Sequence, residues 1–250
     1  MAERDIDLGK STRRALAALR PAPRVPTMPW SAEGSTWRAP PATLAILVLG
    51  LCLFGVGEGT LIDAGLGNTP WTVLAQGIAG RTPLDIGAAT IAVSIVVLLG
   101  WIPLRQTPGI GTIGNVILIG LALDVASRVL PQPRALPWQL LQVGIGIATV
   151  GLGGALYLTA NLGPGPRDGW MTGIHRRTGI GVATVRTTIE IFALAVGIAL
   201  GGRAGFGTIA FAVLVGYTLA ASFRVMTWAV AGPREHALEP VTQERPVPRD

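Results

Sequence analysis

Six apolar runs, each long enough to cross a bilayer as a helix, constrain this chain more than any other feature of its sequence. A helix rises about 1.5 Å per residue, so about 20 apolar residues span the roughly 30 Å of hydrocarbon. The first run contains Glu58 and Asp63, the fifth contains Arg186 and Glu190, and the other four are almost free of charge. The runs lie at 42–63, 84–104, 112–130, 137–159, 180–201 and 207–230. They predict an all-α, polytopic transmembrane helix bundle of about six spans.

The net charge of +6 does not indicate a nucleic-acid partner, although half of the residues are apolar and only 14% are charged. The basic residues lie in the tails and between apolar runs, where topology determinants belong, and no basic patch is interleaved with aromatic residues. One cysteine, Cys52, and two histidines, His175 and His236, provide neither a disulfide framework nor a metal cluster. We therefore predict no cofactor, no metal site and no nucleic-acid binding.

The two ends of the chain are polar and rich in proline. Residues 1–41 hold seven Arg and Lys residues, and we expect them to form a disordered basic leader in the cytoplasm. We do not expect a cleaved signal peptide, because the first apolar run begins too far along the chain and is long enough to span. Residues 231–250 are expected to be a disordered C-terminal tail. The arginine bias between apolar runs places both termini on the cytoplasmic side.

An internal repeat organises the apolar part of the chain. Shifting the sequence by 96 positions aligns residues 50–129 with 146–225 without a gap, and ordered Leu-Gly-x-x-Pro, Ile-x-x-Arg-Thr and Thr-Ile matches lie among the shared glycines. The repeat divides the membrane part into 42–130 and 131–230. With three spans in each half, the second half begins on the opposite side of the membrane, so we predict an inverted-topology pair.

Each half also contains a helix break, in "LGNTPW" from Leu66 and in "LGPGPRDGW" from Leu162. Glycine followed closely by proline ends one helix and begins another. The segment that follows is only about eleven residues long, too short to cross the membrane. Two interpretations stay open: re-entrant half-helices that meet near a central site, or turns followed by interfacial helices. The break residues are Gly67, Pro70, Gly163 and Pro166.

Ionisable residues within or beside the spans are the candidate site residues, because charge is costly in hydrocarbon. Arg167 and Asp168 lie at the second break, where they either hold a polar or anionic substrate group or neutralise each other at the membrane boundary. Arg186 and Glu190 are four residues apart on one helix face and form either a relay or a structural ion pair. Glu58 lies in a glycine-rich stretch, "GVGEGT".

The chain resembles the YczE/YyaS/YitT-like group of bacterial integral membrane proteins over roughly residues 44–228. The resemblance rests on "GLGNTPWTVLAQGIAGRT", "WIPLRQTPGIGT", "NLGPGPRDGWMTGIHRRTG" and "GFGT". It implies a multi-pass protein of the bacterial cytoplasmic membrane. A few members of the group are linked to control of secondary-metabolite synthesis, but the resemblance carries no substrate and no catalytic residue to this chain.

Two functional hypotheses follow. The first is a small secondary transporter of an anionic or polar small solute, working by alternating access of two inverted halves, with a homodimer as an option because six short spans make a thin wall. The second is a membrane regulator or scaffold that does not transport. An enzyme is not expected, and no catalytic residue is assigned, because the sequence shows no His/Glu metal spacing, no Ser-Lys or Asp-Asp pair within the membrane and no nucleophile elbow.

Overall fold

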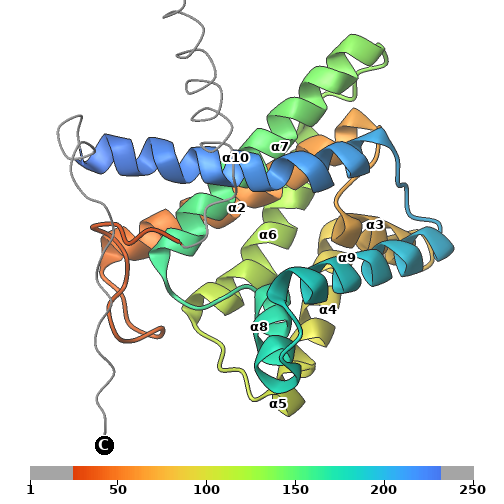
Figure 1. The fold of residues 1–250 in the computed structure, drawn as a ribbon. Coiled ribbons are helices and arrows are strands. Elements are labelled where there is room, and N and C mark those ends of the chain that lie inside the picture. The colour runs from red at the N-terminus through yellow and green to blue at the C-terminus, as the bar shows by residue number, and fades with distance from the viewer. Residues whose placement is uncertain (1–24, 232–250) are drawn as a thin grey trace, which may run out of the picture.

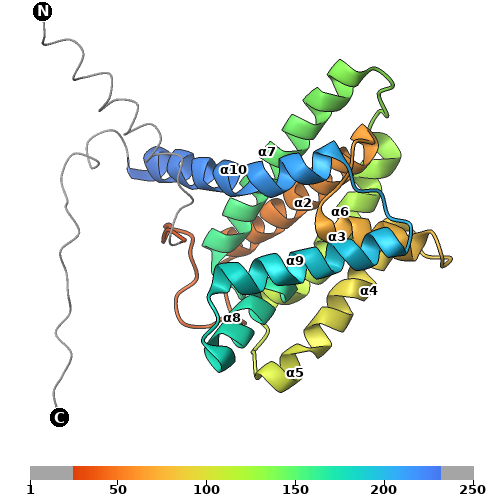
Figure 2. The same cartoon turned by 45° about the vertical axis from the view of Figure 1, so that its right-hand side comes forward.

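The computed structural model describes residues 25–231 and contains helices and no β-strand over that range (Figures 1 and 2). The all-α prediction is confirmed. The helices are α2 (Pro41–Ala64), α3 (Pro70–Ala79), α4 (Ile86–Leu99), α5 (Trp101–Leu104), α6 (Ile110–Val129), α7 (Leu136–Ala160), α8 (Pro166–Thr178), α9 (Val182–Ala199) and α10 (Phe206–Ala231).

Five helical segments in the described part of the chain are long and apolar enough to cross a membrane: α2, α4 continued by α5, α6, α7 and α10. They coincide with five of the six predicted spans. Their outward faces carry large apolar side chains, such as Val96, Ile102 and Val129, which are 66%, 74% and 76% exposed. Such surfaces are unsuited to water and suited to lipid. The remaining predicted span, 180–201, corresponds to α9, which is not among the five and stays a prediction.

The predicted leader falls outside the described residues as far as residue 24, and the predicted tail does so from residue 232. Within the remainder of the leader, residues 28–32 pack on the C-terminal end of α7, and the carbonyl of Thr36 accepts from the N–H of Ile110 at the start of α6. The indole Nε1 of Trp30 donates to Thr159 Oγ1 at 3.1 Å, and the amide of Asn161 donates to the carbonyl of Ala32 at 2.9 Å. Met28 and Ala32 are buried in this contact.

Helices α2 and α7 cross at the centre of the fold through glycines. A Cβ atom added to Gly57 would lie 2.8 Å from the carbonyl oxygen of Gly146, and one added to Gly153 would lie 2.6 Å from that of Gly50. The two backbones are therefore in direct contact, which is how helices pack closely where no water drives them together. Gly50 contacts Gly153, whereas Gly57, farther along α2, contacts Gly146, which lies earlier in α7, so the two helices are antiparallel.

These contacts come in equivalent pairs: replacing each residue of a contact by its counterpart in the other half gives a second contact that is also present. Gly57 and Gly153 differ by the repeat offset of 96, as do Gly50 and Gly146. Helix neighbours follow the same rule: α2 packs on α6 as α7 packs on α10, and α3 packs on α9 as α8 packs on α4. The short helices α3 and α8 follow the C-terminal ends of antiparallel helices, so they belong to opposite ends of the α2–α7 pair (Figure 1).

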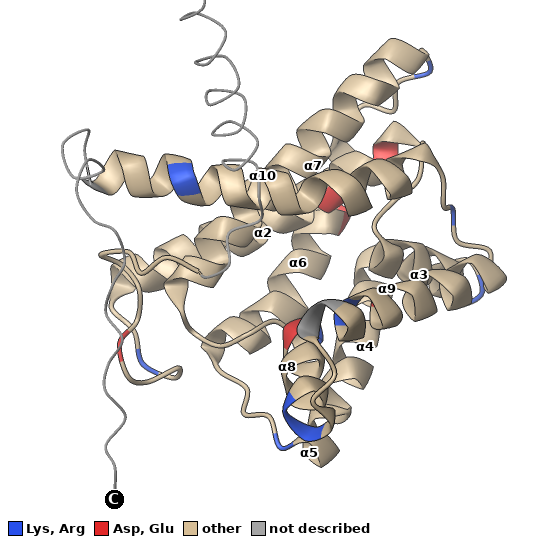
Figure 3. Cartoon of the chain, in the orientation of Figure 1, with Lys and Arg blue, Asp and Glu red and all other residues tan. Residues whose placement is uncertain are grey.

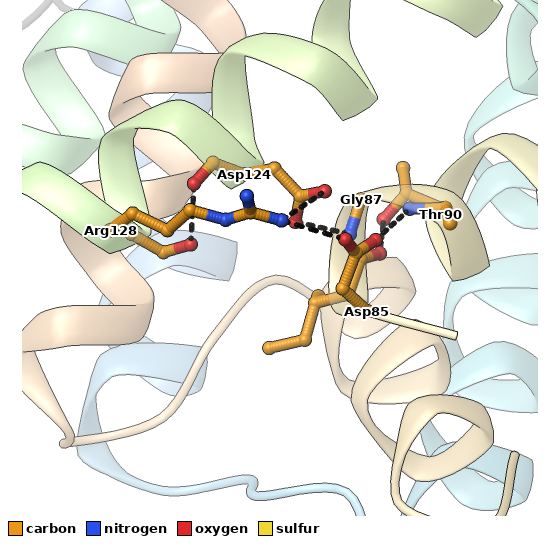
Figure 4. Close-up of polar contacts among 8 residues, drawn as sticks. Asp85, Gly87, Thr90, Asp124 and Arg128 are labelled. Carbon is orange, nitrogen blue, oxygen red and sulfur yellow. Dashed lines mark hydrogen bonds and ion pairs between the residues drawn. The ribbon is translucent and has the colours of Figure 1, made fainter. Parts of the chain in front are cut away.

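The start of α4 is fixed on α6 by a polar cluster that joins Asp85, Asp124 and Arg128 (Figure 4). Asp85 caps α4 by accepting from the backbone N–H of Ala88 at 2.9 Å, and Asp124 accepts from the N–H of Gly87 at 2.8 Å. Arg128 pairs with Asp85 at 2.9 Å. Two of the amides that a helix start leaves free are thus satisfied by carboxylates.

Replacing Gly153 by alanine tests the helix crossing. A Cβ there would lie 2.5 Å from the backbone nitrogen of Phe54, whereas a Cβ at Gly144 on the same helix would meet nothing within 4 Å. We expect Gly153→Ala to lower the free energy of unfolding in detergent by about 1–3 kcal/mol through overpacking. Gly144→Ala should leave it unchanged or raise it by up to about 1 kcal/mol through helix propensity. Equal effects of the two variants would contradict the crossing.

Replacing Asp85 by alanine tests the polar cluster through pH. The N–H of Ala88, with added support from the charge of Arg128, lowers the pKa of the Asp85 carboxyl below its ordinary value of about 3.9. A lowered pKa in the folded state stabilises the protein above the ordinary value, and this stability is lost as the pH falls through the lowered pKa. Asp85→Ala should therefore lower the unfolding temperature at pH 7, and its difference from wild type should shrink below pH about 4. A difference that does not vary with pH would show that the charge of Asp85 contributes nothing.

Candidate functional site

A central cavity of about 140 Å³ lies where the first turns of α3 and α8 meet. Pro70 and Trp71 line it from α3, and Pro166 and Arg167 line it from α8. Side chains of α2, α6, α7, α9 and α10 complete its wall. Both short helices direct their N-terminal ends at this cavity, and such ends carry partial positive charge and free amides. The cavity therefore lies where the N-terminal ends of two short helices converge, as expected for half-helices that meet near a central site.

Arg167 and Trp71 contact each other across the cavity. The guanidinium carbon of Arg167 lies 4.8 Å from the centroid of the Trp71 ring, a cation–π distance. The two residues occupy corresponding positions of the repeat, 96 apart. The half-buried Arg167 also interacts electrostatically with Glu58, Asp168 and Glu190. One cation thus faces three carboxylates that come from α2, α8 and α9.

Asp168 has a partner that the sequence did not predict. The hydroxyl of Tyr157 on α7 donates to Asp168 Oδ2 at 2.6 Å. Tyr157 is 5% exposed and lines the central cavity. No ion pair joins Arg167 to Asp168 in residues 25–231, so each of the two lies against a different group. The signal that the sequence offers for Tyr157 is a phenol within the apolar run "GGALYLTA".

Glu58 lies behind the cavity wall and is fully buried. Its Oε1 accepts from Thr69 Oγ1 at 3.2 Å, and Thr69 lines the cavity. Its Oε2 has no hydrogen-bond donor among the described residues. The flanking glycines of "GVGEGT" hold the neighbouring helices close, since Gly57 touches α7 and Gly59 touches α6. The close packing of these helices around Glu58 therefore leaves its carboxyl with no solvent-accessible surface.

Arg186 and Glu190 form an ion pair on α9, with 3.0 Å between Nε and Oε1, and both line the central cavity. Their side chains are 50% and 34% exposed, so water and lipid headgroups compete for this pair more than for Glu58. All five predicted site residues thus gather at or directly behind one cavity. With every group ionised, the carboxylates exceed the guanidiniums by one. The described residues contain no group of three His, Cys, Asp or Glu that could hold a metal ion.

Cavities larger than the central one lie at both helix breaks. The α3-end cavity, about 460 Å³, lies at the break between α2 and α3, and the α8-end cavity, about 650 Å³, lies at the break between α7 and α8. Five lining residues of one correspond to five of the other by the repeat offset. They are Ile62, Asp63, Gly65, Gly67 and Asn68 in the α3-end cavity, and Leu158, Thr159, Asn161, Gly163 and Pro164 in the α8-end cavity.

Residues 42–223 match the model of a family described as a family of unknown function (DUF6198). The chain is 43% identical over 192 residues to an uncharacterized protein of Haemophilus influenzae, an alignment that covers 77% of this chain and 88% of that protein. It is 32% identical over 196 residues to the uncharacterized membrane protein YczE of Bacillus subtilis, covering 76% and 88% of the two chains. Identity to the uncharacterized protein YyaS of the same organism is 25% over 175 residues, covering 68% and 87%. No solved structure matches the chain.

Proposed function

This chain belongs to the DUF6198 family and is a YczE/YyaS-like membrane protein, and from the geometry of its central cavity we propose that it is a small secondary transporter. The solute that we propose is small and polar, with an anionic group that faces Arg167 and the first turns of α3 and α8. The proposed location is the bacterial cytoplasmic membrane, with both termini in the cytoplasm.

One observation carries the proposal. Two short helices that follow opposite ends of an antiparallel pair meet with their first turns at a single cavity, which charged side chains of the second half line and behind which Glu58 of the first half lies. Broken helices that present their ends to a site between two repeats are the arrangement by which many secondary transporters bind solutes. A scaffold has no need for buried charge at such a point, since each such charge costs at least about 2.5 kcal/mol in the middle of a bilayer.

The paired end cavities support alternating access. They lie at corresponding breaks of the two halves, and the central cavity lies between the two breaks. A rocking of one half against the other would open the site to one end cavity and close it to the other. The contacts that exchange the halves support inverted repeats, with α9 as the sixth span.

The distribution of arginines supports the proposed orientation (Figure 3). Arg105 follows α5, Arg176 and Arg177 lie near the end of α8, and α5 contacts α8, so these three residues share one end of the molecule. An excess of Lys and Arg marks the cytoplasmic side of a membrane protein. The α8 end would then face the cytoplasm and the α3 end would face outward. A homodimer stays a prediction.

Cysteine labelling tests the inverted topology. Ala79 near the end of α3 and His175 near the end of α8 are corresponding positions of the repeat. With Cys52 replaced by serine, we expect a membrane-impermeant thiol reagent to label Ala79→Cys in intact cells and His175→Cys only in inverted vesicles. Labelling of both positions from the same side would end the inverted-repeat proposal.

Flux into proteoliposomes tests transport itself. Vesicles that contain purified protein are given a mixture of small polar metabolites under an imposed ion gradient, and the solutes retained inside are identified by mass spectrometry. We expect at least one solute to accumulate above the level in empty vesicles, and we expect Arg167→Ala to abolish and Glu190→Gln to reduce this accumulation. Gly144→Ala, which changes an open surface position, is the matched control. Wild-type vesicles that accumulate no more than empty ones would favour a regulator or scaffold.

A further inference from the structure

Glu58 is a buried carboxyl with too few partners for a permanent charge. It is fully buried, one of its oxygens accepts a single hydrogen bond from Thr69, and the other accepts none from the described residues. The charged group that acts on it from the surrounding helices is Arg167 of α8, while α3 contributes the hydroxyls of Thr69 and Thr72. Arg167 makes no ion pair with it in residues 25–231 and is shared with Asp168 and Glu190.

A carboxylate in this position is costly, because burying a charge without a paired ion loses its hydration. Taking up a proton removes that cost and supplies a donor for a neighbouring acceptor. Releasing the proton restores a negative charge beside Arg167. The Glu58 carboxyl can therefore exist in a protonated and an ionised state, which differ in the charge that acts on Arg167 in the central cavity. Glu58 itself does not line that cavity.

We infer that Glu58 is a proton-binding site, filled from the α3-end cavity through the break between α2 and α3, and that its proton is the coupling ion of this protein. The coupling role rests on the proposed transport function, whereas proton binding stands on the geometry alone. The step is a simple protonation: a proton from water enters, the carboxylate becomes a carboxylic acid, and nothing is oxidised or reduced.

Buried polar groups mark the route. Asp63 and Asn68, which are 5% and 2% exposed, both line the α3-end cavity. Asp63 Oδ2 and Asn68 Oδ1 have no donor among the described residues, so each can accept from water that enters the cavity. Asn68 is followed in the chain by Thr69, whose hydroxyl contacts both Glu58 and Thr72. The break thus carries polar side chains from the α3-end cavity to Thr69, the residue that donates to the buried carboxyl.

The buried carboxyl and the polar side chains that lead to it belong to the first half only. The positions that correspond to Glu58, Asp63, Asn68 and Thr69 in the second half are Gly154, Thr159, Pro164 and Gly165. None of these carries an ionisable side chain. The α8-end cavity is lined by Glu33 and by hydroxyl side chains such as Thr159, but the position that corresponds to the buried carboxyl of Glu58 is Gly154, so a proton that enters from that end meets no counterpart of Glu58.

Protonation would change which solute the central cavity prefers. With Glu58 ionised, Arg167 is attracted to three carboxylates and the site carries one excess negative charge. With Glu58 neutral, the charges of the site balance, and the two helix starts favour an anion. The substrate of the proposed transporter is therefore a small anion that binds together with a proton.

Infrared difference spectroscopy tests proton binding without a solute. Purified protein is taken from high to low pH, and the C=O stretch of newly protonated carboxyl groups is recorded. We expect a band from a buried acid that is absent in Glu58→Gln and present in Glu190→Gln. In wild-type protein, ¹³C labelling of glutamate should shift this band and ¹³C labelling of aspartate should not, which tests the assignment even if Glu58→Gln fails to fold. Identical spectra of wild type and folded Glu58→Gln, or no shift with labelled glutamate, would overturn the inference.

A pair of cysteine variants tests the route. In the Cys52→Ser background, Asn68→Cys lies in the α3-end cavity and Pro164→Cys lies at the corresponding position of the α8-end cavity. After reaction with a bulky methanethiosulfonate reagent, we expect the Glu58 band to appear severalfold more slowly after a pH jump in Asn68→Cys and at an unchanged rate in Pro164→Cys. Slowing in neither variant, or equally in both, would overturn the route.

The result separates this inference from the transport proposal. A Glu58 band in a protein that shows no flux of any solute supports the proton site and removes its coupling role. Flux that is unchanged in Glu58→Gln, together with the absence of the band, overturns the inference and leaves the transport proposal intact.

Discussion

The need to satisfy backbone groups where a helix breaks among apolar surroundings determines the arrangement of this protein. Peptide groups at such a break have no water to bond, so the protein must supply the partner. The carbonyl of Leu66 accepts from the N–H of Gly207 at 2.7 Å, and the carbonyl of Leu162 accepts from the N–H of Gly111 at 2.8 Å. Each break is thus completed by the start of the last span of the other half. Neither half has a satisfied backbone alone, which explains why the two are interleaved.

The bonding of each break to the other half also determines where the charged residues lie. The glycines that follow these carbonyls, Gly67 and Gly163, have φ values of 108° and 110°, a conformation that residues with a Cβ rarely adopt. The chain therefore turns in the same way at both breaks, and the next helices start toward a common point. Corresponding residues then meet there, and because they differ, Trp71 contacts Arg167 where a symmetric protein would place two identical side chains together.

The features of this structure that depend on local sequence pattern could be predicted from the sequence. The long apolar runs predicted the ends of the five spans to within two residues, because the length and hydropathy of a segment determine whether it can cross a membrane as a helix. The spacing of Arg186 and Glu190 indicated their ion pair. The bond from Tyr157 to Asp168 and the pairing of Asp85 with Arg128 join residues that lie on different helices, so no spacing predicts them. Residues 28–32 lie in a stretch with the composition of a flexible tail, and no spacing predicts their contacts with α7.

The differences between the halves carry as much meaning as their likeness. Two identical inverted halves would give the inward-facing and outward-facing states equal free energies, and a solute with equal affinity for both could not shift them. Glu58 opposite Gly154 and Asp63 opposite Thr159 remove that equality. In the proposed cycle, a proton held on Glu58 would interact with Arg167 differently in each state, because the distance between the halves would change as they rock. A difference of charge between the halves would thus let one proton shift the balance of the two states, while the gradients of proton and solute would set the direction of transport.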